Sequence, residues 1–219
     1  MLIKNISALF FVMISGLFVN NIYPQGYNYK GTEYPDSNRY NWFEKTSSKD
    51  NMLIADSLAI MNFEDKINAI PYIAKRKDKN FSLILDKIFY QEFENKNEKE
   101  QLLYLMIDDF FTDEESVENS KDSFLMICEN ISGYKNSILR KKIMEKTVLL
   151  DTKNSEKILI KEAMFLLNEG NKSKKFDIEM LEETRFFYFY SEKIDSPVLK
   201  DYRQMIYIAV SNIPYTFLD

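Results

Sequence analysis

The amino-acid sequence predicts an all-α protein in which short antiparallel helical hairpins stack as a small α-solenoid. Three observations favour this fold. From residue 49 onward, apolar residues recur at spacings of three and four, which place them on one side of an α-helix. Only 5 of the 219 residues are glycine, whereas β-hairpin turns depend on glycine. The expected helices are short and consecutive, which favours a solenoid over the alternative, an irregular helical bundle.

Residues 1–25 are expected to be an export signal. Lys4 supplies a positive charge, and the run from Ile6 to Val19 is apolar apart from two serines and a glycine. A membrane-spanning helix needs about 20 residues, so this shorter run suits a signal peptide better. Cleavage is expected near Gln25 or Gly26, and an uncleaved anchor is the alternative. The protein is therefore expected in the periplasm or cell envelope, with release from the cell as the alternative, and this segment is its only expected membrane contact.

Residues 26–48 are expected to form an extended, aromatic-rich linker ahead of an all-α domain at residues 49–219. The linker contains turn formers, including Pro35, and shows no sustained helical or strand period. Some of its rings are expected to pack against the helical domain. A platform that stacks on sugars is the alternative role for these rings.

The helical domain is expected to open with a helix from Lys49 to Met61. Pro71 then sets the start of the second helix, because proline deep inside a helix costs about 3 kcal/mol. With Asn68 as the N-cap, Pro71 lies in the first turn, where its missing N–H has no partner in any case. The second helix is therefore expected to run from Asn68 to about Lys77.

Seven further helices are expected, which gives about nine in all. An acid-rich turn from Thr112 to Asn119 precedes the helix that carries Cys128. Gly133 is expected at the end of that helix, and Gly170 is expected to close the one capped by Asn154 or Ser155. For five of the nine helices the sequence predicts one apolar face. In chain order these faces are Ile54, Leu58 and Met61; Phe81, Ile84, Leu85, Ile88 and Phe89; Leu103, Met106, Ile107, Phe110 and Phe111; Phe124, Ile127, Cys128 and Ile131; and Leu139, Ile143, Thr147 and Leu150.

The last helices are bounded by capping residues. Asp177 is the expected N-cap of a helix that runs to about Ser191. Ser196 caps the final helix, with Pro197 at the first helical position that proline favours, and Pro214 ends regular structure. The remaining expected faces are Ile160, Ala163, Met164 and Leu167, and then Val198, Tyr202, Met205, Ile206 and Ala209.

Paired helices are expected to start near residues 69, 98, 136 and 177, at separations typical of helical-hairpin repeats. The string Asp65-Lys66, followed by Ala69-Ile70-Pro71-Tyr72-Ile73, resembles the start of a HEAT repeat, where an acidic residue precedes an AIPxL-like string. The next helix departs from that family, because the stretch from Phe81 to Leu85 lacks the usual arginine and small alanines. The resemblance implies an α-solenoid with a concave binding surface and a role as a scaffold or adaptor, and it supplies no catalytic residue.

The composition excludes several classes of chemistry. Histidine is absent and Cys128 is the only cysteine, so the usual zinc sites and histidine-dependent nucleophiles cannot be built. Cys128 is expected to be a buried structural thiol. The net charge of −5 argues against nucleic-acid binding, and the scarcity of glycine argues against a phosphate-cradling loop. No catalytic residue, metal ion or cofactor is therefore expected.

The basic clusters at Lys75–Lys77, Arg140–Lys142 and Lys172–Lys175 are interpreted as solvated helix ends and turns. A small site for an acidic ligand is the alternative. The acidic stretch from Asp108 to Glu118 is likewise interpreted as a solvated turn. A cation site or an acid–base pair is the alternative there, although the stretch lacks EF-hand spacing.

Six consecutive residues form the candidate partner-binding site. Five successive rings wrap every side of a helix, so either the helix is sandwiched between neighbours or one edge is an exposed recognition patch for a protein chain or a glycan. The six residues are Arg185, Phe186, Phe187, Tyr188, Phe189 and Tyr190.

The function expected from these observations is that of an exported, non-enzymatic helical-repeat protein that binds a protein partner in the cell envelope. The alternatives are an all-α envelope enzyme with paired carboxylates that acts on glycans or peptides, and a carrier of a small ligand. A cleft with two facing acids would favour the enzyme. An enclosed apolar cavity would favour the carrier.

Overall fold

All regular structure in the described residues is helical, so the predicted all-α class is confirmed. The computed structural model describes residues 40–46, 50–76, 81–173 and 178–211. These ranges contain eleven α-helices, α2 to α12, and one 3-10 turn, η3, whereas the sequence predicts about nine helices. The predicted signal peptide, the linker up to residue 39, Asp177 and Pro214 lie outside the described residues, as do the side chains of the cluster from Lys172 to Lys175.

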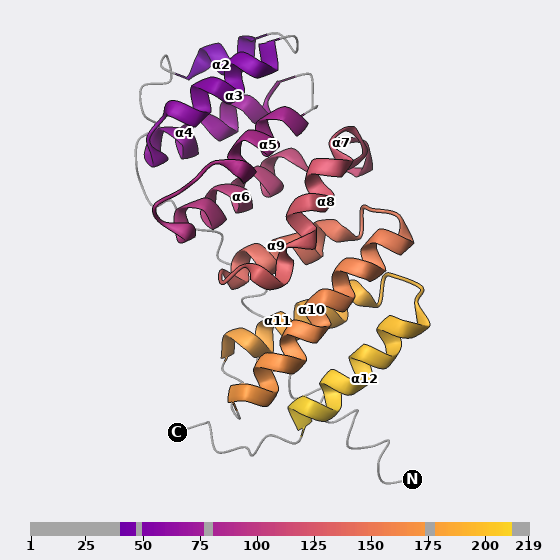
Figure 1. The fold of residues 1–219 in the computed structure, drawn as a ribbon. Helices are drawn as coiled ribbons and strands as arrows, with labels where there is room; N and C mark the ends of the chain where they lie inside the picture. Colours follow the sequence, from indigo (N-terminus) through magenta and orange to yellow (C-terminus); the bar gives the residue numbers. More distant parts are fainter. Residues whose placement is uncertain (1–39, 47–49, 77–80, 174–177, 212–219) are drawn as a thin grey trace, which may run out of the picture. The chain divides into compact units, whose positions relative to one another are not determined.

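The described α-helices other than α7 form two rows, and within each row a helix packs beside the next member (Figure 1). The first row consists of α2 (Asn41–Lys45), α4 (Phe63–Ala74), α6 (Lys96–Phe110), α9 (Ser137–Thr147) and α11 (Ile178–Ser191). The second row consists of α3 (Asn51–Ile60), α5 (Ser82–Tyr90), α8 (Lys121–Glu129), α10 (Thr152–Ser173) and α12 (Pro197–Ser211). Helix α7 (Glu114–Asn119) and η3 (Ile131–Gly133) lie in the connections before and after α8.

Neighbours within a row run in the same direction and keep a similar offset in sequence. Three hydrogen bonds illustrate this offset: Gln91 Nε2 donates to the Ala59 carbonyl (2.8 Å), Ser123 Oγ donates to Asp86 Oδ1 (2.8 Å), and the Asn136 N–H donates to Glu100 Oε2 (2.7 Å). The bonded residues are 32, 37 and 36 positions apart. This offset is close to the helix-pair separations that the sequence predicts.

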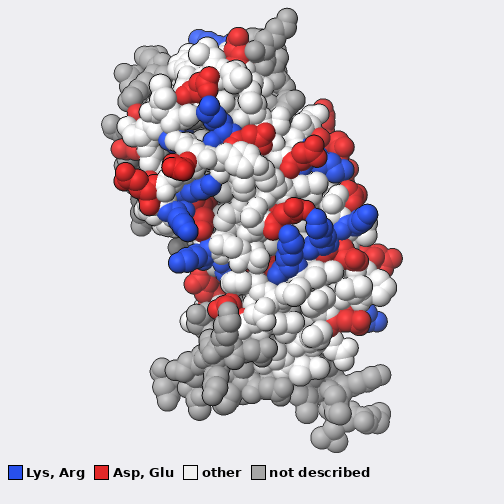
Figure 2. Space-filling model, viewed as in Figure 1, with Lys and Arg blue, Asp and Glu red and all other residues white. Residues whose placement is uncertain are grey.

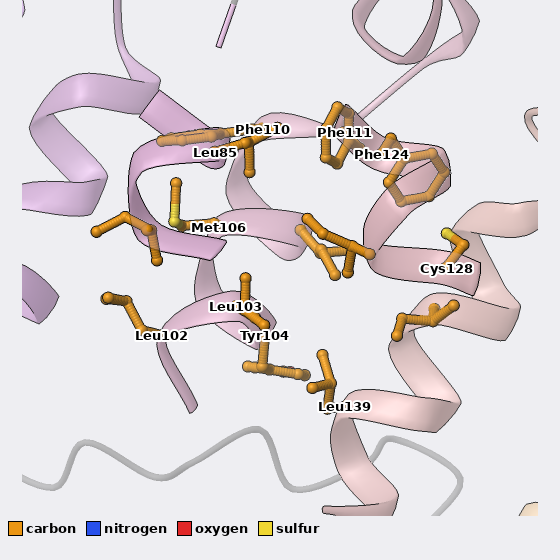
Figure 3. Packing of buried hydrophobic residues seen from close by; sticks show 14 of the residues in the cluster. Leu85, Leu102, Leu103, Tyr104, Met106, Phe110, Phe111, Phe124, Cys128 and Leu139 are labelled. Atoms are coloured by element: carbon orange, nitrogen blue, oxygen red, sulfur yellow. The ribbon is translucent and has the colours of Figure 1, made fainter. Parts of the chain in front are cut away.

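Aromatic residues make up 15% of the sequence, and their rings fill much of the core (Figure 3). The rings of Phe81 and Phe110 stack with centroids 3.9 Å apart, and the rings of Phe111 and Phe124 lie 4.5 Å apart. Cys128 lies on the same side of α8 as Phe124 and is fully buried, so the predicted buried thiol is confirmed (Figure 3). Burial raises the pKa of the Cys128 thiol, which keeps it protonated and unreactive.

Most of the predicted apolar faces are confirmed. These buried residues are Ile54 and Leu58 in α3; Phe81, Ile84, Leu85 and Ile88 at α5; Leu103, Met106, Ile107, Phe110 and Phe111 at α6; Phe124, Ile127, Cys128 and Ile131 at α8; and Leu139, Ile143, Thr147 and Leu150 at α9. The predicted helix start near Asn136 and the predicted N-cap Ser196 are confirmed as well. Asn136 accepts hydrogen bonds at the start of α9, and Ser196 Oγ accepts the Leu199 N–H at the start of α12.

Helix α4 begins earlier than the sequence predicts, so Pro71 lies inside the helix rather than in its first turn. Asn62 is the N-cap, and its side chain accepts the backbone N–H of Asp65 at 2.9 Å. Ile67 and Ile70 are buried in the resulting helix, where α4 packs between α2 and α6. The prediction of a start near Asn68 was wrong, because this cap and this burial outweigh the cost of the proline.

Replacing Pro71 with alanine is expected to raise the free energy of unfolding by about 2 kcal/mol. Alanine removes a helix defect worth about 3 kcal/mol and restores an N–H for the Ile67 carbonyl. The gain is reduced by about 0.4–1 kcal/mol, because alanine makes the unfolded chain more flexible and so stabilises the unfolded state. Pro71 is exposed, so no packing is lost. Urea denaturation measures the change, and Pro197→Ala is the matched control, because Pro197 occupies a favourable first position and its replacement should bring no gain. A loss of stability in P71A would contradict the account of α4.

The acid-rich segment after α6 is a short helix, α7, rather than the predicted turn. Asp113 accepts the backbone N–H of Ser116 at 2.8 Å, and the Asp113 N–H donates to Ser116 Oγ at 3.2 Å, which forms a capping box. Gly133 closes η3 and not the helix of Cys128, because α8 already ends at Glu129. Gly170 lies within α10 and does not end it.

The buried sides of α10 and α12 are rotated from the predicted ones. Both helices carry apolar residues on several sides, so their neighbours, and not the sequence period, decide which side is covered. In α10 the buried residues include Leu159, Ala163 and Leu166, whereas Met164 is exposed. In α12, Leu199 and Ile206 are buried, whereas Val198 and Met205 are exposed.

The described end of the predicted linker is helical. Asn41–Lys45 form α2, which packs against α4, and Tyr40 and Phe43 are buried. The helical domain therefore begins before residue 49, because these two rings join its core. The burial of Tyr40 agrees with the expectation that some rings of this region pack on the helical domain.

Candidate functional site

The basic cluster of α9 is buried, which contradicts the predicted solvated helix end. Arg140, Lys141 and Lys142 lie in the middle of α9 and not at its end, with α6, α10 and α11 packed around the helix. All three side chains are buried. Consecutive helical residues point about 100° apart, so the three cations reach different neighbours.

Arg140 is the centre of a buried charge cluster between α9, α10 and α11. Its guanidinium forms an ion pair with Glu183 of α11 and donates to the backbone carbonyl of Tyr134. Its Nε lies 3.6 Å from Oε1 of Glu162 on α10, and its guanidinium lies 4.4 Å from the ring centroid of Phe165. One cation therefore faces two carboxyl groups, and the cluster carries one negative charge too many if both are ionised.

Glu162 is the carboxyl group without its own counter-charge. Its side chain is 0% exposed, and within the described residues neither of its oxygens accepts a hydrogen bond. Burial, opposed by Arg140 and reinforced by Glu183, raises the pKa of Glu162 to about 8. We infer that Glu162 is mostly protonated at neutral pH, which leaves one cation and one anion in the cluster.

Lys141 and Lys142 connect α9 to its two neighbours in the first row. Lys141 Nζ lies 3.0 Å from Glu182 Oε2 on α11. Lys142 Nζ lies 2.8 Å from Asp108 Oδ1 on α6 and 2.8 Å from Glu145 on its own helix. These two carboxylates raise the pKa of Lys142 despite its burial. The three consecutive cations thus tie α6, α9, α10 and α11 together.

The acidic stretch that the sequence singles out does not converge on one point. Asp113 is used as a helix cap, Glu118 pairs with Lys121 at 3.3 Å, and Asp108 pairs with Lys142. Burial and the neighbouring Asp108 raise the pKa of Asp109 to about 6. No group of acids within the described ranges is arranged to hold a metal ion. The described residues thus give no support to the alternative of a cation site.

The aromatic helix α11 divides the candidate partner-binding residues. Phe187 is fully buried, and the rings of Phe186, Tyr188 and Tyr190 are half-buried between neighbouring helices, as a sandwiched helix requires. Phe189 is 57% exposed, and Lys193 Nζ lies 4.3 Å from its ring centroid. The remaining member of the set, Arg185, is half-buried. The partner-binding role of these residues remains a prediction.

Exposed apolar side chains are concentrated in the second row. Of the large apolar residues that are exposed, those of the first row all lie on α11, namely Ile178, Leu181 and Phe189. Those of the second row are Met52, Leu53 and Ile60 on α3, Leu83 and Tyr90 on α5, Met164 on α10, and Val198, Met205, Tyr207 and Ile208 on α12. On the face shown in Figure 2, acidic and basic side chains lie together in mixed groups, and uncharged surface lies between these groups.

Sequence reasoning missed the buried acids Glu162 and Glu183. A signal for Glu162 is present, because Leu159, Ala163 and Leu166 surround it at helical spacing and make it a charged residue within an apolar stripe. Such a residue needs a buried partner. That partner, Arg140, lies more than twenty residues away in the sequence, so local patterns do not reveal the pair.

No protein family, no curated protein and no solved structure matches this chain. The resemblance of Asp65–Ile73 to a HEAT repeat therefore stays a prediction. None of the helices in the described part of the chain combines the length and the apolar character that crossing a membrane requires.

Proposed function

We propose that this chain is an exported α-solenoid that binds a protein partner as a scaffold or adaptor in the cell envelope, without enzymatic activity. Two features support the solenoid. Alternate helices form two rows, and hydrogen-bonded neighbours within a row lie 32 to 37 positions apart in the bonds described above. Both features are expected when successive helical hairpins stack side by side along the axis of a solenoid.

The exposed apolar side chains of the second row carry the proposal of protein binding. Ile60 is 88% exposed and Tyr90 is 71% exposed, and both lie at the C-terminal ends of neighbouring helices, α3 and α5. The bond from Gln91 to the Ala59 carbonyl holds these two ends together. Contiguous exposed apolar groups on one face are typical of protein interaction sites. The first row, by contrast, pairs its charges internally through α9.

No described feature favours the enzyme or the small-ligand carrier. Glu162 and Glu183, the closest approach to an acid pair, are buried around Arg140 and do not line an open cleft. Both alternatives therefore remain without a supporting observation from the described residues.

The double substitution Ile60→Ser and Tyr90→Ser is expected to reduce partner binding about tenfold, because apolar anchors provide most of the binding energy of an interface. A photo-crosslinker placed at Met52 in cells that express the full chain should yield one defined product in the wild type and little in the double variant. Ile178→Ser is the matched control, because it removes an equally exposed apolar residue from the first row. An unchanged product in the double variant, or an equal loss in the control, would contradict the proposal. Thermal unfolding should be unchanged in both, since all three residues are exposed.

A further inference from the structure

The exposed side of α10 contains a basic hollow that none of the contacts above uses. It has a volume of about 640 Å³, is open to solvent, and is lined by Lys153, Asn154, Glu156, Lys157, Ile160 and Lys161. The three lysines stand at every fourth position and therefore share one side of the helix. These three lysines make one side of the helix basic, although the chain as a whole has a net charge of −5.

The hollow already holds one carboxylate from another helix. Glu129, the last residue of α8, forms an ion pair with Lys157, and its backbone carbonyl accepts a hydrogen bond from Lys161 Nζ at 2.9 Å. The contact with Lys157 and the charges of both lysines lower the pKa of Glu129. The hollow thus stabilises an ionised carboxylate at one of its edges.

In the N-terminal part of the hollow, Lys153 is available to bind an anion. Within the described residues, no acidic side chain pairs with Lys153. Glu156 accepts a hydrogen bond from Ser196 Oγ at 2.5 Å and so is held toward α12. Asp151 caps α10 through Asn154 and pairs with Lys121 at 3.3 Å. A second carboxylate beside Lys153 would meet a cation that no acid of the described segments neutralises, near the positive end of a 22-residue helix.

Apolar groups of the second row lie next to the hollow. Met126 precedes Glu129 by one helical turn on α8, and its sulfur accepts a hydrogen bond from the Tyr90 hydroxyl at 2.9 Å. Ile160 forms an apolar part of the lining of the hollow itself. The surface from α5 to α10 therefore offers first an aromatic ring, then a thioether, and then cations.

We propose that this surface binds an acidic segment of a partner protein, of which one carboxylate pairs with Lys153 while its apolar side chains contact Tyr90 and Met126. This inference rests on the proposed role in protein binding and specifies the chemistry of the partner. An acidic peptide fits better than a nucleic acid or a lipid surface, because apolar side chains adjoin Lys153 and suit a carboxylate that is flanked by apolar residues. Carboxylates at Glu129 and Asp151 would repel a continuous row of negative charges more strongly than one such carboxylate.

The test uses the full chain and a dye-labelled synthetic peptide that alternates glutamate with leucine. Fluorescence anisotropy at low salt is expected to show binding that weakens about fivefold or more in Lys153→Glu, since attraction is replaced by repulsion. Lys200→Glu is the matched control, because Lys200 is an exposed lysine of α12 outside the hollow. Among the described residues Lys153 has no acidic partner, so its substitution should leave the thermal unfolding midpoint unchanged. Equal binding to both variants would overturn the proposal.

Two further arms separate this proposal from the proposed function. A peptide with glutamine in place of glutamate is expected to bind at least about fivefold more weakly than the acidic peptide. If both peptides bind equally, and Tyr90→Ser weakens both, acid recognition is wrong while binding by the second row stands. If neither peptide binds, the acidic-segment proposal is wrong, and the crosslinking at Met52 decides the function separately. Binding of phosphatidylglycerol vesicles that is lost in K153E, with no peptide binding, would assign the hollow to a lipid surface instead.

Discussion

Replacing Arg140 with methionine is expected to lower the free energy of unfolding by about 3–5 kcal/mol, the usual cost of removing one partner from a buried ion pair. The substitution keeps much of the side-chain volume but leaves Glu183 buried without its cation, and it takes a donor from the Tyr134 carbonyl. Both groups were desolvated on folding, and neither gains a new partner. Urea denaturation at neutral pH measures the loss.

Two further variants separate the buried charge from the loss of side-chain packing. Lys157→Met removes a cation from an exposed pair and should cost only about 0–1 kcal/mol. The double variant Arg140→Met and Glu183→Gln should recover part of the loss, because it removes the stranded carboxylate along with the cation. A loss below about 1 kcal/mol in R140M would show that the cluster contributes little, and that α9 is held by its apolar face alone.

Local patterns in the sequence predict the helices better than they predict how the helices contact each other. The apolar spacing from Phe81 to Phe89 and the helix start near Asn136 are local features, and both are confirmed. The start of α4 was wrong because the penalty of Pro71 is local, whereas the burial of Ile67 that offsets it depends on helices elsewhere in the chain.

The candidate sites depend on tertiary contacts even more strongly. From the sequence alone Arg140 is expected to be solvated, because its neighbours in sequence are basic. The acids that face it in the core lie on α10 and α11. In the same way, Ile160 and Met164 satisfy a helical period, but the packing of α10 covers the side that carries Leu159 and Glu162. Helices with apolar residues on several sides leave this choice open in the sequence.

Raising the pH from about 5 to about 8 is expected to destabilise the protein through Glu162. Its pKa is near 4.5 in the unfolded chain and about 8 in the folded chain, so between these values the folded state holds a proton that the unfolded state has lost. The free energy of unfolding must then fall as the pH rises, by up to about 1.4 kcal/mol per pH unit. Asp109, raised from 3.8 to about 6, adds a change of the same sign below pH 6.

The groups with lowered pKa act in the opposite direction at lower pH. Glu129 and Asp151 lose their ion pairs and hydrogen bonds when they are protonated, so stability is also expected to fall as the pH drops below about 4. These two side chains are largely exposed, and their contribution is small. Stability is therefore expected to be highest near pH 4, at the acidic end of the decline caused by Glu162 and Asp109.

Glu162→Gln is expected to remove most of the decline between pH 6 and 8, because glutamine carries no charge at any pH and Arg140 keeps its pair with Glu183. Urea denaturation at several pH values measures the slope, and Glu92→Gln, a change at an exposed loop acid, should leave the slope unchanged. A steep decline that persists in E162Q would place the titrating group elsewhere. A stability that rises with pH in the wild type would mean that Glu162 is ionised in the folded chain. Arg140 would then balance two carboxylates at once, and R140M would cost more than the range expected for a single pair.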